Sequence, residues 1–112
     1  MNIDLEKFSN ACIAMGKGQD TGNIKDDRKH YRIVQSVYFL LKKDNRLDEL
    51  LELLDHENPH VRFRAAEFAL RFEPIKAEQA LEKISKTERG VGFVAMMTLS
   101  EWRKGNLKFE DE

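Results

Sequence analysis

The hydrophobic residues of this chain recur every three or four positions, which is the period of amphipathic helices. The clearest case is residues 50–72, where one apolar run ends at Leu54 and a second begins at Val61. Between them, Asn58 is a favourable N-cap, and Pro59 suits the first helical position because proline has no N–H to leave unsatisfied there. The stretch therefore predicts a helix, a short turn and a second helix.

The same period continues along the chain, and no alternating stretch is long enough to predict a strand. We expect six helices, spanning residues 3–15, 23–43, 44–54, 59–72, 74–86 and 91–104. The first is expected to end at Gly16 and Gly18. The expected apolar stripe of the third consists of Leu47, Leu50, Leu51 and Leu54. Residues 1–105 are expected to form one domain, followed by a charged tail at 106–112.

Two of the expected helix pairs share one pattern at an offset of thirty residues. The matched residues are Leu51 with Leu81, Leu54 with Ile84, Val61 with Val91, Phe63 with Phe93, Ala65 with Ala95, and Phe72 with Trp102. A single helix pair cannot bury its apolar faces alone, so repeated pairs stack on one another. The sequence predicts an all-α fold, a short right-handed α-α superhelix of three antiparallel pairs. A six-helix globule without repeat symmetry is the less economical alternative.

The segment from Leu50 to Arg62, followed by Ala65, Ala66 and Leu70, resembles a HEAT repeat. Such repeats have leucines on the first helix, an acidic turn with proline, and then Val-Arg and alanines on the second. The wider span 23–105 is similar to a small bacterial domain-of-unknown-function family with HEAT-like helices. The resemblance implies a fold and a soluble bacterial setting, and it supplies no catalytic motif.

The expected helix 59–72 is apolar on two opposite faces, which is typical of a helix sandwiched between neighbours. Its narrow polar stripe maps by the repeat offset onto an apolar stripe of the last helix. Charged residues beside an apolar patch are typical of a protein-docking surface. The candidate partner-binding residues are Arg64, Glu67, Arg71, Val94, Met97 and Glu101. Alternatively, the tail covers Val94 and Met97 through Leu107 or Phe109.

Arg62 lies on the flank of the same helix, away from the polar stripe. A half-buried guanidinium needs acceptors for its N–H groups, so we expect a structural ion pair there. Asp55 and Glu57 are among the candidate partners.

The segment His56–His60 matches the H-E-x-x-H motif of zinc proteases. That site needs both histidines one turn apart on a continuous helix, and Pro59 would clash within such a helix. We therefore expect His56 in the turn, His60 in the next helix, and no catalytic zinc. Cys12 lies on the apolar stripe of the first helix and is expected to be a core residue.

Nineteen basic residues against twenty acidic ones give a net charge of -1, which does not favour binding to nucleic acid or anionic membranes. A local basic run at 25–32 contains Lys25, Arg28, Lys29 and Arg32, but two aspartates interrupt it. No apolar run approaches the roughly 20 residues of a membrane span. No signal peptide is visible, and the single cysteine fits the cytoplasm.

These observations predict a cytoplasmic, non-enzymatic module without a cofactor, whose partner is another protein. An immunity protein or an adaptor fits its size, and the chain is expected to be a monomer or a weak homodimer. The alternative is a nucleic-acid-binding helical-repeat protein that uses the basic run at 25–32.

Overall fold

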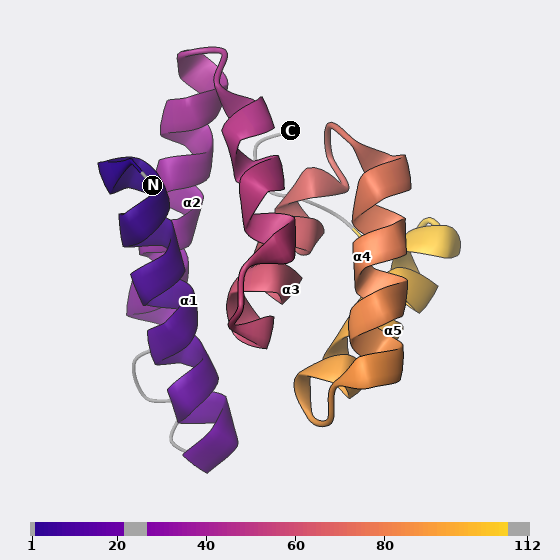
Figure 1. Ribbon diagram of the computed structural model, residues 1–112. Helices are drawn as coiled ribbons and strands as arrows, with labels where there is room; N and C mark the ends of the chain where they lie inside the picture. Colours follow the sequence, from indigo (N-terminus) through magenta and orange to yellow (C-terminus); the bar gives the residue numbers. More distant parts are fainter. Residues whose placement is uncertain (1, 22–26, 108–112) are drawn as a thin grey trace.

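The computed structural model describes residues 2–21 and 27–107 of the chain. Within these ranges the backbone forms six helices and no strand. They are α1 (Ile3–Thr21), α2 (Asp27–Lys43), the 3-10 helix η1 (Leu47–Asp55), α3 (Pro59–Ala69), α4 (Pro74–Thr87) and α5 (Val91–Arg103). Consecutive helices pack as three pairs, α1 with α2, η1 with α3, and α4 with α5 (Figure 1). The predicted all-α fold with six helices in three pairs is confirmed.

Helix α3 lies between the other two pairs and borders two hydrophobic clusters (Figure 1). Val61, Ala65 and Phe68 face the first cluster, which α1, α2 and η1 complete. The opposite face meets the second cluster, formed with α4 and α5, through Phe63, Ala66, Ala69 and Leu70. The sandwiched position predicted from its two apolar faces is thus confirmed.

The ends of α3 and α5 follow the local sequence. The Asn58 side chain accepts a hydrogen bond from the backbone N–H of His60 at 2.9 Å, and Pro59 occupies the first turn of α3. Gly105 follows α5 with φ of +77°, a left-handed conformation that glycine adopts without steric cost. These two boundaries agree with the predictions, whereas α3 itself ends at Ala69 rather than at residue 72.

The third expected helix is a 3-10 helix, and its leucines follow a period of three. Leu47, Leu50 and Leu53 face the first cluster, while Leu51 and Leu54 reach the second. The predicted stripe omitted Leu53, which is 3% exposed, because it assumed the wider spacing of an α-helix. With the tighter period of a 3-10 helix, the leucines of this one short helix contact both clusters.

The predicted end of the first helix at Gly16 and Gly18 is wrong, because α1 continues to Thr21. Gly16 lies against the side chain of His60 from α3, and a Cβ at this position would overlap the imidazole carbons Cγ and Cδ2. The glycine therefore serves a close approach of α1 to α3 rather than a helix end. The predicted start of the second helix at residue 23 lies outside the described residues.

Candidate functional site

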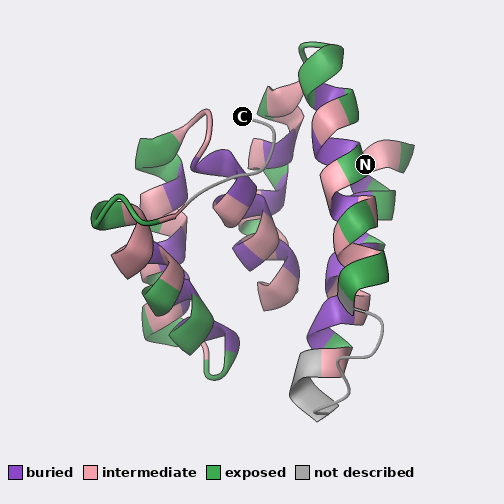
Figure 2. Ribbon diagram, turned by 180° about the vertical axis from the view of Figure 1, so that it is seen from behind, coloured by how far each residue is buried: buried purple, intermediate pink, exposed green. Residues whose placement is uncertain are grey.

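Helix α5 is apolar on its buried face and on its exposed face. Val91, Ala95 and Leu99 belong to the second cluster. At about 100° per residue, Phe93, Val94 and Met97 fall on the other side of the helix. Large apolar residues are exposed on α5 to 63% at Phe93, 48% at Met96, 47% at Met97 and 38% at Val94. Figure 2 shows that the last helix pair carries several exposed segments, drawn in green. A second apolar face of this extent marks α5 as the leading candidate for a docking surface.

The described part of the C-terminal tail leaves this face exposed. Leu107 is partly buried against the second cluster, and Val94 and Met97 keep their exposure. Asn106 donates a hydrogen bond from Nδ2 to Oε2 of Glu101 at 2.9 Å, so the tail turns at the end of α5. Phe109, the other residue expected to cover the patch, lies outside the described residues.

The charged half of the predicted surface is largely buried, and tyrosine rings of α2 lie against its two arginines. Arg64 donates from Nη1 to Oε1 of Glu67 at 3.0 Å, and the two side chains are only 16% and 17% exposed. The guanidinium carbon of Arg64 lies 5.4 Å from the ring centroid of Tyr31 and 5.1 Å from that of Phe63. Arg64 and Glu67 therefore offer little surface to a partner and help to pack α3 against α2.

Arg71 has a similar position seven residues further along the chain. Its guanidinium carbon lies 4.7 Å from the ring centroid of Tyr38 and 4.5 Å from that of Phe68. Stacking of a guanidinium on aromatic rings contributes on the order of 0.5–2 kcal/mol. Of the six predicted site residues, Val94, Met97 and Glu101 lie on α5, while Arg64, Glu67 and Arg71 lie between α3 and α2.

Arg62 forms an ion pair, and its partner is Glu88 rather than Asp55 or Glu57. Its Nη2 lies 3.2 Å from Oε2 of Glu88, in the turn between α4 and α5. The repeat offset maps Glu88 onto Asn58, so this turn corresponds to the one before α3. The candidates Asp55 and Glu57 lie in the turn just before α3. The acid that pairs with Arg62 is instead Glu88, which lies 26 residues after it in the sequence.

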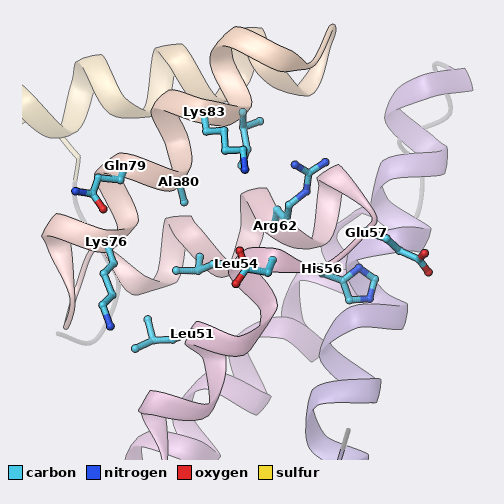
Figure 3. A pocket seen from close by; sticks show the side chains of 11 residues that line it. Leu51, Leu54, His56, Glu57, Arg62, Lys76, Gln79, Ala80 and Lys83 are labelled. Carbon is cyan, nitrogen blue, oxygen red and sulfur yellow. The ribbon is translucent and has the colours of Figure 1, made fainter.

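A cleft of about 640 Å³ lies between η1 and α4, with Arg62 of α3 at its side (Figure 3). Its lining combines apolar side chains with both signs of charge. The lining residues are Leu51, Leu54, Asp55, His56, Glu57, Arg62, Lys76, Gln79, Ala80, Lys83 and Ile84. Sequence reasoning did not find this cleft, because its walls come from three helices and no local motif marks it.

Comparison with known proteins places this fold. A family model described as "Domain of unknown function (DUF2019)" matches residues 4–101. The chain belongs to the DUF2019 family. Membership confirms the predicted resemblance to a domain-of-unknown-function family. No curated protein matches the chain.

A solved structure shares the fold of this DUF2019 domain. The crystal structure of the protein RPA1889 from Rhodopseudomonas palustris CGA009 superposes with a TM-score of 0.81 at 23% sequence identity. The match covers 96% of this chain and 91% of that one. At this identity the likeness establishes the fold alone.

The zinc-protease motif of this DUF2019 domain is split between a turn and a helix. His56 follows η1, and its Nδ1 accepts a hydrogen bond from the backbone N–H of Asn58 at 3.0 Å. His60 lies in the first turn of α3, against Gly16. Among the described residues, no group of three or more histidine, cysteine, aspartate or glutamate side chains is placed to hold a metal ion.

Cys12 is fully buried in the first cluster, as predicted for a core residue. Burial raises the pKa of its thiol to about 12, with smaller influences from Arg64 and Glu67. The thiol stays protonated at neutral pH and is a poor nucleophile.

The predicted basic run is described only from Arg28 onward. Arg28, Lys29 and Arg32 are exposed on α2, while Lys25 lies outside the described residues. No helix in the described ranges has the length and apolar character needed to cross a membrane.

Proposed function

We propose that this DUF2019 domain is a protein-binding module without chemistry of its own, which docks another protein on the exposed face of α5. One observation carries the proposal: four large apolar side chains are 38–63% exposed on a single helix whose other face is already buried. Fold stability does not require these side chains, because the buried face supplies the contacts to α4.

In this proposal Phe93, Val94 and Met97 form the centre of the interface, and Met96 and Glu101 lie at its margin. Aromatic and methionine side chains are favoured at the centre of interfaces, and methionine adapts to uneven partner surfaces. Burying a large apolar side chain contributes about 1.5–3 kcal/mol, so a few anchors supply useful affinity.

Arg64, Glu67 and Arg71 have an indirect role in this proposal, since the two arginines lie against tyrosine rings of α2 and Glu67 pairs with Arg64. The module is proposed to act as an immunity protein or an adaptor, as a monomer or a weak homodimer.

The test is capture of a partner from an extract of the native host cells, with the double variant Phe93→Glu/Met97→Glu. Ile75→Glu is the matched control, because Ile75 is 71% exposed and lies on α4, off the proposed surface. A protein captured by the unmodified chain and by the control, but not by the double variant, supports the proposal. Equal capture by all three chains refutes α5 as the interface.

The alternative of nucleic-acid binding rests on the exposed side chains of Arg28, Lys29 and Arg32. Affinity for mixed-sequence DNA that persists at physiological salt, and is lost in Arg28→Ala/Lys29→Ala, would replace the proposal above.

A further inference from the structure

The cleft between η1 and α4 has an apolar floor and charged walls. Leu51 and Leu54 come from η1, and Ala80 and Ile84 from α4; we call these four residues the apolar floor. Figure 3 shows the two leucines and Ala80 facing the space between the helices. A volume of about 640 Å³ is in the range of pockets that hold small molecules.

Two cationic side chains lie toward one end of the cleft. In Figure 3, the amine of Lys83 and the guanidinium of Arg62 extend toward the same end, above Leu54. Lys76 extends at the opposite end, and Glu57 points away from the floor (Figure 3). This end of the cleft therefore carries two cationic groups, of which Arg62 is also paired with Glu88.

The cations at this end are not fully engaged within the protein. Arg62 uses Nη2 to contact Glu88 at 3.2 Å, but its buried Nε has no hydrogen-bond partner among the described residues. Lys83 forms no ion pair with any described residue and its side chain is exposed. The Arg62 side chain as a whole is 18% exposed, so a ligand carboxylate can approach the part of the guanidinium that Glu88 leaves accessible.

We propose that this cleft binds a small carboxylate carried on an aliphatic body. The carboxylate lies at the end formed by Lys83 and Arg62, and the aliphatic body covers the apolar floor. Three cationic residues against two anionic ones line the cleft, an excess of a single positive charge. This balance favours a monoanion, because Asp55 and Glu57 would repel a more highly charged group such as a polyphosphate.

The same chemistry has two sources, a free aliphatic acid and the C-terminal carboxylate of a polypeptide that ends in an apolar residue. Both present one carboxylate next to an aliphatic group. The experiment therefore uses two probes, octanoate and acetyl-Gly-Leu, each with a neutral counterpart, octanol and acetyl-Gly-Leu amide.

Binding is followed by titrating each probe into the full ¹⁵N-labelled chain and recording amide shifts. We expect a carboxylate probe to shift the amides of cleft residues such as His56 and Gln79, with its neutral counterpart at least about fivefold weaker. Lys83→Gln should weaken that probe by about fivefold or more. Lys86→Gln is the matched control, since Lys86 is also exposed on α4 but does not line the cleft.

Tight binding of octanoate alone assigns the cleft to a free acid, and tight binding of acetyl-Gly-Leu assigns it to a polypeptide terminus. Equal binding of each acid and its neutral counterpart overturns the proposal, as does equal weakening by Lys83→Gln and Lys86→Gln. Shifts confined to α5 instead of the cleft also overturn it. Because α5 and the cleft are lined by different residues, this test is independent of the proposed protein-binding role.

Discussion

The contact of Gly16 with His60 gives a prediction whose sign depends on the magnitudes. Alanine normally stabilises a helix interior relative to glycine, by about 0.5–1 kcal/mol. At Gly16, however, the added Cβ would overlap the ring carbons of His60 and lie 2.9 Å from its Cβ. Overpacking of this kind costs about 1–3 kcal/mol. We therefore expect Gly16→Ala to lower the free energy of unfolding by about 1–2 kcal/mol.

The overlap also predicts that the two positions are coupled. In a His60→Ala background the ring is gone and only the contact between the two Cβ atoms remains. The energetic cost of the overlap is then smaller, and the higher helix propensity of alanine offsets most of the remaining cost. Gly16→Ala should be close to neutral in that background, which corresponds to a coupling energy of at least about 1 kcal/mol.

Urea unfolding of the four chains of this cycle, followed by circular dichroism, measures the coupling. The propensity term is measured in the same helix by comparing Asn10→Ala with Asn10→Gly, because Asn10 is exposed on α1. Equal destabilisation by Gly16→Ala with and without the His60 ring would refute the reasoning. Stabilisation by Gly16→Ala alone would show that α1 and α3 separate without cost.

Two further predictions concern the first cluster. Phe68 is fully buried, and its ring centroid lies 5.1 Å from that of Tyr38 and 6.1 Å from that of Phe8. Phe68→Ala should therefore lower the free energy of unfolding, measured in urea, by about 3–5 kcal/mol. A loss below about 1 kcal/mol would contradict the central position of this ring. The pKa of the Cys12 thiol is about 12 in the folded chain against the ordinary 9.0, so the unfolded state loses its proton first and stability falls as the pH rises from 9 toward 12. Native protein should resist a thiol reagent at neutral pH and react with it in urea, and Cys12→Ala should show a shallower loss of stability over that pH range; rapid native labelling would contradict the burial.

The sequence predicted correctly those structural features that depend only on residues close together in the chain. The cap at Asn58 and Pro59 depends on hydrogen bonding within one turn, and the two apolar faces of α3 depend on helical spacing. Both features are encoded over a few residues, so both were predictable.

Features that depend on distant residues were not predictable in the same way. Gly16 marks a helix end by its type, and only the position of His60 explains why the helix continues through it. Arg62 was expected to find an acid nearby, whereas the fold brings it Glu88. The charges of Arg64 and Glu67 suggested exposure, but Tyr31 of α2 covers that part of α3.

The candidate site shows the same division. The repeat offset predicts that Val94 and Met97 share a stripe of the last helix, and the structure shows both side chains exposed there. The cleft between η1 and α4 depends on how three separate helices pack, since η1, α3 and α4 all contribute to its lining. The spacing of the leucines predicts that Leu51 and Leu54 share a face, but not that Ala80 and Ile84 of α4 lie opposite them.

The position of α3 between two clusters has a consequence for how the domain unfolds. Both clusters use this one helix as a wall, so its loss exposes apolar surface in each of them at once. The first pair of helices and the last pair are therefore thermodynamically linked, although they are far apart along the chain. We therefore expect the amides of α3 to exchange with solvent only when the whole domain opens, and the two halves to melt in one cooperative transition.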